Sequence, residues 1–78
     1  MLLYVYDLKI KGLKAYNTLK RRFYYNLAKS KLSGAPFRTK SVLVVSDELE
    51  VFADNFFKQY SGFIEVYKAR TTSIIQIN

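Results

Sequence analysis

Asp7 is the one carboxylate of the first half of the chain that could take part in catalysis. It ends an apolar run, and a single carboxylate makes a magnesium site only when further carboxylates or substrate phosphates join it. Two copies of Asp7 across a dimer axis would supply two carboxylates. The alternative interpretation is an Asp that ends a strand and accepts backbone hydrogen bonds. Asp7 is therefore the candidate catalytic and metal-binding residue, and Mg²⁺ is the candidate cofactor.

The cations are the residues that could bind an anion, and they are distributed unevenly. The chain has 13 Lys and Arg against 6 Asp and Glu, a net charge of +7, yet no acid lies between Leu8 and Ser46. This polarity raises the local concentration of polyanions and predicts association with nucleic acid or an acidic surface. The competing interpretation is a lysine-rich surface of a thermostable protein, although such surfaces mix both signs of charge.

Residues 13–32 follow a helical period, which predicts how these cations are positioned. One stripe recurs at spacings of three and four and should face the core, and it consists of Tyr16, Leu19, Phe23 and Leu27. The opposite side carries cations with no acid to pair with, so phosphates would offset their mutual repulsion. Tyr25 lies among these cations, and Arg38 and Lys40 of the next segment add two more. The predicted nucleic-acid-binding residues are therefore Lys14, Arg21, Arg22, Tyr25, Lys29, Arg38 and Lys40.

Composition excludes several classes of protein. The chain has no Cys and no His, so disulfides, zinc fingers and mechanisms with a Cys nucleophile or an imidazole base are excluded. Neither a GxxxxGK[ST] loop nor a GxGxxG motif is present, which argues against nucleotide-dependent enzymes. The apolar runs are shorter than the roughly 20 residues that cross a bilayer. We expect a soluble, cytoplasmic protein without a membrane partner.

The pattern of elements predicts one domain over residues 1–78. Phe37–Asp47 is rich in β-branched residues and is expected to be a strand in the middle of the sheet. Asp47 and Glu50 have the spacing of a capping box that starts a helix with the apolar positions Leu49, Phe52, Ala53, Phe56, Phe57 and Tyr60. Further strands are expected at 1–8, 63–68 and 71–77.

This order predicts an α+β fold, a ferredoxin-like two-layer sandwich of order β-α-β-α-β-β. Its antiparallel sheet would carry both helices on one face. The other face of the sheet would be uncovered, because so short a chain has no further element to cover it. A second copy of the protein could cover this face, so we expect a homodimer. The last strand could either turn back within its own subunit or pair with the partner's sheet edge.

Three segments resemble the Cas2 family of CRISPR-associated proteins. Tyr4-Val5-Tyr6-Asp7 is similar to that family's first strand, Arg38-Thr39-Lys40-Ser41-Val42-Leu43-Val44 to its second, and Glu65-Val66-Tyr67-Lys68 to a later strand. The resemblance implies a homodimer that acts with a Cas1-like protein on double-stranded DNA. It also implies that Asp7 would be the metal-facing residue near the dimer axis, because metal-dependent nuclease activity is assigned to some members. Leu43 departs from the pattern, since an aromatic residue is usual there.

These observations predict a small, basic, homodimeric nucleic-acid-binding protein, with DNA favoured over RNA. It would act in CRISPR adaptation or in a related mobile-element or viral process. One alternative is a magnesium-dependent nuclease centred on Asp7. Another is a non-enzymatic interaction module whose basic face docks an acidic protein.

Overall fold

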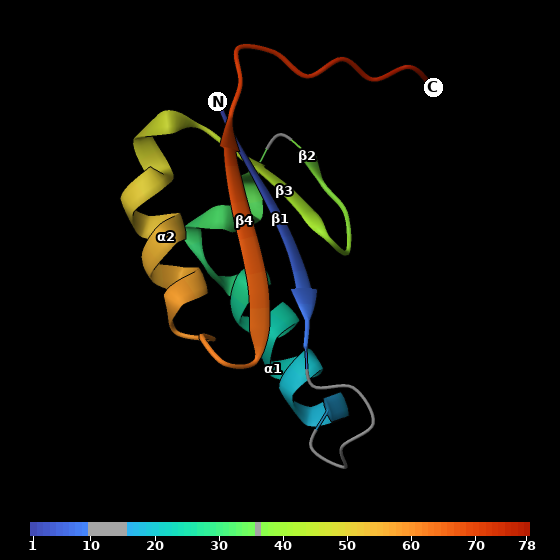
Figure 1. Ribbon diagram of the computed structural model, residues 1–78, viewed down its shortest axis with the longest axis vertical. Helices are drawn as coiled ribbons and strands as arrows, with labels where there is room; N and C mark the ends of the chain where they lie inside the picture. The colour runs from blue at the N-terminus through green and yellow to red at the C-terminus, as the bar shows by residue number, and fades with distance from the viewer. Residues whose placement is uncertain (10–15, 36) are drawn as a thin grey trace.

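The chain forms an α+β fold in which a small antiparallel sheet carries two helices (Figure 1). The computed structural model describes residues 1–9, 16–35 and 37–78, with residues 37 and 38 through their backbone alone. The strands are β1 (Leu2–Leu8), β2 (Phe37–Arg38), β3 (Val42–Val45) and β4 (Ile64–Arg70). The helices are α1 (Tyr16–Lys29) and α2 (Glu50–Lys58), and 3-10 turns follow α1 at Lys31–Gly34 and precede α2 at Asp47–Leu49.

The sheet is built on β1, which lies between its two neighbours. Its full order is β2-β3-β1-β4, and every pairing is antiparallel. Tyr4 of β1 lies opposite Leu43 on one side and Lys68 on the other. Three strands of four to seven residues therefore make the sheet in the order β3-β1-β4, and the two-residue β2 extends only its β3 edge.

The expectation of one continuous strand over Phe37–Asp47 is wrong. The backbone turns at residues 39–41, where the Thr39 N–H donates to the Val42 carbonyl at 2.8 Å. The Thr39 hydroxyl accepts from the N–H groups of Ser41 at 3.2 Å and Val42 at 3.0 Å. A threonine side chain that satisfies nearby N–H groups competes with strand pairing, so β-propensity alone does not keep the segment extended.

The predicted strand over residues 71–77 is also wrong, and with it the order β-α-β-α-β-β. The Thr71 N–H donates to the Met1 carbonyl at 2.9 Å, and residues 71–78 form no strand. The elements instead run β1-α1-β2-β3-α2-β4. Because β2 has only two residues, the arrangement is less than a full ferredoxin-like sandwich.

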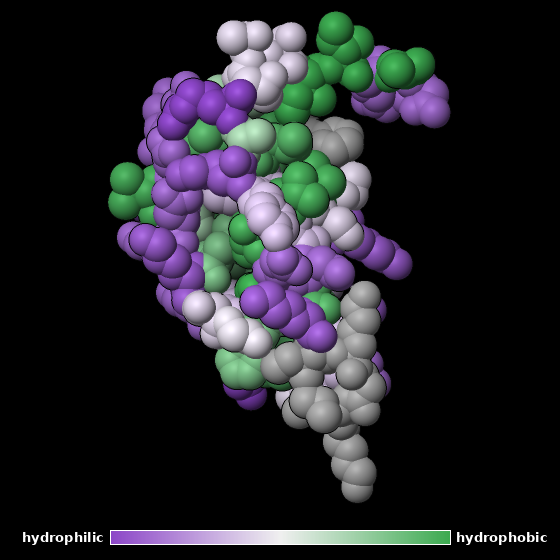
Figure 2. Space-filling model, in the orientation of Figure 1, coloured by the Kyte–Doolittle hydropathy of each residue, from purple (hydrophilic) through white to green (hydrophobic). Residues whose placement is uncertain are grey.

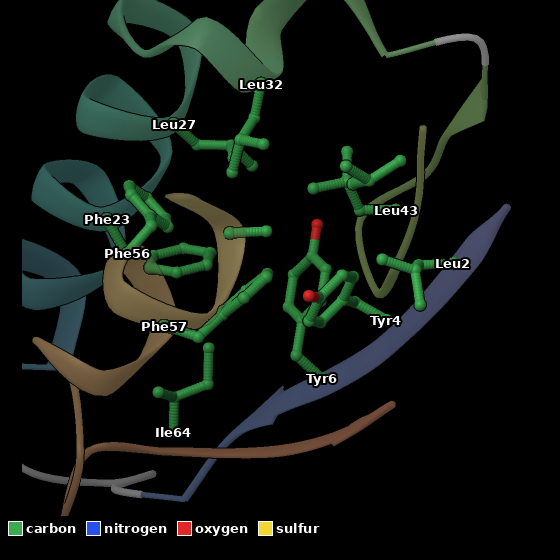
Figure 3. Packing of buried hydrophobic residues seen from close by; sticks show 12 residues of the cluster. Leu2, Tyr4, Tyr6, Phe23, Leu27, Leu32, Leu43, Phe56, Phe57 and Ile64 are labelled. Carbon is green, nitrogen blue, oxygen red and sulfur yellow. The ribbon is translucent and has the colours of Figure 1, made fainter. Parts of the chain in front are cut away.

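The core lies between the sheet and the two helices (Figure 3). Both helices cover one face of the sheet, as predicted. The Tyr4 ring stacks on Phe57 of α2 with ring centroids 5.1 Å apart, and the Tyr6 ring meets Phe23 of α1 edge-on at 5.5 Å. The helical periodicity is confirmed at the buried residues Phe23, Leu27, Ala53, Phe56 and Phe57. Tyr16 and Leu19, by contrast, are only half-buried. Each fully buried aromatic or aliphatic side chain contributes roughly 1.5–3 kcal/mol.

The other face of the sheet carries no helix. Val5 is 41% exposed there and Tyr67 is 64% exposed, whereas Val44 is only 1% exposed. The C-terminal residues 74–78 line a hollow that they share with Val44. In Figure 2 their hydrophobic side chains project from the top of the molecule. Within the described residues, no helix has the length and apolar character that a membrane span requires.

Candidate nucleic-acid interface

Glu50 and Asp54 of α2 are joined to cations of β4 at one edge of the sheet. The Lys68 ammonium lies 2.8 Å from Glu50 Oε2 and 2.9 Å from Asp54 Oδ2, and the Arg70 guanidinium lies 2.9 Å from Glu50 Oε2. The Tyr4 hydroxyl also donates to Asp54, at 2.6 Å. Burial, followed by this hydrogen bond, raises the pKa of Tyr4 above its ordinary value. This network ties α2 to β4 and β1.

The predicted capping box does not form. Asp47 accepts from the N-terminal ammonium of Met1 at 2.7 Å, and no side chain caps the start of α2. Glu50 is held instead by the hydrogen bonds from Lys68 and Arg70, which lower the pKa of its carboxyl. Asp47 and Glu50 therefore hold the chain end and β4 to the start of α2.

The cations of α1 differ from those of β4 because they form no ion pair with an acid among the residues that the structure describes. Arg21, Arg22 and Lys29 are exposed on the side of α1 that faces away from the core. Across the described part of the chain, the ion pairs connect Asp47, Glu50 and Asp54 with Met1, Lys68 and Arg70. The α1 cations are therefore available to an external anion.

Tyr25 lies among these cations, as the helical period predicted. Its side chain is 62% exposed, and the Lys29 ammonium lies 5.6 Å from the centroid of its ring. An exposed aromatic ring beside cations is a suitable surface for a sugar or a base. The structure thus places Arg21, Arg22, Tyr25 and Lys29 on one helix surface.

The turn between β2 and β3 brings Lys40 next to Tyr24 of α1. The Tyr24 hydroxyl of α1 donates to the Lys40 carbonyl oxygen at 2.6 Å, and the Tyr6 hydroxyl donates to the Thr39 carbonyl oxygen at 3.3 Å. Tyr24 also lines a shallow hollow with Arg21. The turn is therefore fixed beside the Arg21 side of α1.

Two predicted contacts are not placed by the structure. Lys14 lies outside the described residues, and Arg38 is described only as the second residue of β2. Lys20 and Tyr24, which the helical period put at the boundary between the two faces, line the hollow beside Arg21. The hydrogen bond of Tyr24 to the Lys40 carbonyl was missed because it depends on a turn that the sequence analysis did not predict.

Asp7 lies on the face of the sheet that carries no helix. It is exposed, and its directly opposite residue on β4 is Glu65, whose carboxylate accepts a hydrogen bond from the Tyr67 hydroxyl. Within residues 1–9, 16–35 and 37–78, no three acidic, His or Cys side chains gather closely enough to hold a metal ion. A Mg²⁺ ion at Asp7 stays a prediction that needs carboxylates or phosphates from outside this chain.

No model of a protein family matches the chain, and neither a curated protein nor a solved structure does. The functional conclusion therefore depends on the basic surface itself. The name α1 basic surface is used below for the exposed cations of α1 and of the adjoining turn together with Tyr25, namely Lys20, Arg21, Arg22, Tyr25, Lys29 and Lys40.

Proposed function

We propose that this chain is a small, basic, homodimeric protein that binds nucleic acid through the phosphate backbone. The observation that supports this is the separation of the charges. Within the described part of the chain, the cations of the α1 basic surface form no ion pair, whereas Glu50 and Asp54 are paired with Lys68 and Arg70 at the β4 edge. The turn that carries Lys40 lies between β2 and β3, at the opposite edge of the sheet.

Such a surface binds without reading the base sequence. Phosphate contacts supply affinity and orientation, whereas sequence is read by groups that enter a groove. The exposed cations lie on a single helix and on one short turn, and Tyr25 offers its ring to a sugar or a base. Duplex DNA, with its closely spaced phosphates, is the partner that we favour over RNA.

The dimer is proposed to form through the face of the sheet that carries no helix. Val5 and Tyr67 are exposed in the middle of that face, and Leu3 lies beside them on β1. Burying apolar side chains of this kind against a second copy would remove them from water. In the dimer, two α1 basic surfaces would contact the same nucleic acid.

A role similar to that of the Cas2 family is the finer proposal. It is supported by Tyr4-Val5-Tyr6-Asp7 in β1 and by the hairpin that separates the two helices, which together suggest a reduced ferredoxin-like sandwich. On this proposal the dimer holds DNA for a Cas1-like partner in CRISPR adaptation or in a related mobile-element or viral process. The chain would then act by binding and positioning DNA.

Fluorescence anisotropy with a labelled duplex tests the proposed binding. Neutralising Arg22 and Lys29 together (Arg22→Gln, Lys29→Gln) should weaken binding strongly and lower its dependence on salt, because each lost phosphate contact removes about 0.9 from the log-log slope. Lys58→Gln is the matched control, because Lys58 is an exposed cation at the end of α2, beside the hollow that Tyr4 and Asp54 line. Equal affinities for the double variant and the control would contradict the proposal.

A further inference from the structure

We infer that residues 73–77 of each copy add as a strand to the free edge of β4 in a second copy, so that the two chains exchange their C-terminal segments. This inference rests on the homodimer of the proposed function and names the segment and the edge that complete it. Two features of the chain carry it. One is a strand with unpaired backbone groups, and the other is an uncharged segment whose apolar side chains are uncovered.

The β4 strand has one edge without a neighbouring strand among the residues that the structure describes. Just beyond β4, the Thr71 N–H donates to the Met1 carbonyl at 2.9 Å, in the register that pairs β4 with β1. Hydrogen-bonded pairs alternate along an antiparallel ladder, so the odd residues of β4 direct their backbone groups to β1. The residues whose N–H and carbonyl groups point to the free edge are therefore Val66, Lys68 and Arg70.

The cations of this edge are already paired with acids. Charged side chains on an edge strand normally oppose the addition of another strand. Here the Lys68 ammonium lies 2.8 Å from Glu50 and 2.9 Å from Asp54, and the Arg70 guanidinium lies 2.9 Å from Glu50. An uncharged segment can therefore approach the edge without burying an unpaired charge.

Apolar side chains lie on both sides of the edge. On the side of the helices, Phe57, Ile64 and Val66 line an open hollow of about 390 Å³. On the other side, the exposed ring of Tyr67 lies opposite Val5 of β1. Successive residues of a strand point to opposite faces, so an added strand should have apolar residues at neighbouring positions.

The C-terminal segment has this pattern. Residues 71–78 carry no charge and are mostly β-branched, and Ile74 is followed directly by Ile75. The side chains of Ile75 and Ile77 are 82% and 95% exposed, and the segment leaves the sheet beyond the end of β4 (Figure 1). It thus offers apolar side chains to both sides of a β4 edge.

The segment does not pair with the β4 edge of its own chain. It continues directly from β4, so such pairing would need a tight hairpin, and the favoured two-residue turns have residues at positive φ. Among the described residues, only Gly62 has a positive φ, and residues 71–77 contain no glycine. The edge of a second copy sets no such requirement, because the segment can reach it in an extended form.

The size of the uncovered sheet face also favours a second copy as the partner. A stable interface buries about 800 Å² on each partner, from roughly 20–30 residues. The uncovered face presents only alternate residues of three strands of four to seven residues. Two reciprocal strand additions would enlarge the interface, and the assembly closes because each copy gives one segment and accepts one.

The first test measures the dissociation constant of the dimer by analytical ultracentrifugation of the full-length chain. Replacing both isoleucines (Ile75→Ser, Ile77→Ser) should raise this constant at least about tenfold, because the variant loses the burial of two apolar side chains. Val51→Ser, at an exposed apolar position of α2, is the matched control and should leave the constant unchanged.

The second test measures amide hydrogen exchange along β4. The N–H groups of Val66, Lys68 and Arg70 should exchange at least about tenfold more slowly in the dimer than in the monomer, because strand addition pairs them. The N–H groups of Tyr67 and Ala69, which β1 already pairs in the monomer, are the internal control and should change less. The double isoleucine variant should lose the added protection.

The outcomes separate this inference from the proposed function. Equal dissociation constants for the wild type and the double variant, or outward amides that exchange equally fast in monomer and dimer, would overturn the exchange. The dimer would then form through the sheet faces alone, and the β4 edge would be left to a segment of another protein. A wild type that is monomeric at every concentration would overturn the proposed homodimer, and the exchange with it.

Discussion

The hydroxyl of Tyr24 donates a 2.6 Å hydrogen bond to the carbonyl oxygen of Lys40, and this contact joins α1 to the turn between β2 and β3. Two segments that contain no acid thereby meet. The cations of α1 and the cation of the turn are brought together because a tyrosine hydroxyl holds the backbone of the turn. A basic surface is thus assembled by a neutral contact.

Tyr24→Phe tests the contribution of this contact. The variant keeps the edge-on packing of the ring on Phe23, whose centroid is 5.2 Å away, and removes only the hydroxyl. A single hydrogen bond of this kind contributes about 1 kcal/mol, so the free energy of unfolding should fall by about that amount in denaturant titrations. Binding of duplex DNA should also weaken, because the turn that carries Lys40 loses its anchor. An unchanged unfolding free energy would show that the contact does not hold the turn.

Phe57→Ala should destabilise the protein far more. Phe57 packs against both Tyr4 and Tyr6 of β1, so the substitution leaves a cavity between α2 and the sheet. Cavities of this kind cost about 3–5 kcal/mol, which thermal and denaturant unfolding would detect. Val51→Ala, at a position on α2 that is 73% exposed, is the control and should change the free energy by about 0.5 kcal/mol or less. A similar loss in both variants would contradict the assigned core.

The ion pairs of Glu50 predict how stability depends on pH. Hydrogen bonds from Lys68 and Arg70 lower the pKa of the Glu50 carboxyl in the folded protein, so the folded state binds its proton less readily than the unfolded state. Their contribution is complete above the unfolded pKa of about 4.3 and is lost as the pH falls through the lower folded pKa. Glu50→Gln should therefore reduce the loss of stability between neutral and acidic pH in thermal unfolding. A pH profile identical to that of the wild type would contradict this role.

The dimer proposal predicts that a charge on the uncovered sheet face produces monomers. Val5→Lys would place two cations against each other across the interface, and the 41% exposure of Val5 leaves the lysine room to reach water within one subunit. Native mass spectrometry or light scattering should then report a monomer with an unchanged circular dichroism spectrum. Val51→Lys on the exposed side of α2 should remain a dimer. A wild-type protein that is monomeric at all concentrations would rule the dimer out.

The sequence predicted the core well because the signal lies within single elements. Phe23 and Leu27 of α1, like Phe56 and Phe57 of α2, follow the helical period and are buried against the sheet. The strand β4 also alternates: Ile64 is buried toward the helices, and Tyr67 is exposed on the other face. The spacing of apolar residues within one helix or strand is enough to predict which of its side chains are buried.

The errors concern features that depend on other segments. Thr39 satisfies two N–H groups and breaks the expected strand, and strand propensity does not report such competition. Residues 71–77 have the composition of a strand, but a strand also needs a partner edge, which composition does not supply.

The central claim is that the cations of the α1 basic surface meet phosphates, and a salt series on the wild-type protein tests it most directly. The association constant for a labelled duplex, measured at increasing salt, should fall linearly on a log-log plot with a slope of about −0.9 for each phosphate contacted. A dimer that uses several of these cations should give a slope steeper than about −3. A slope near zero, with binding retained, would contradict the claim.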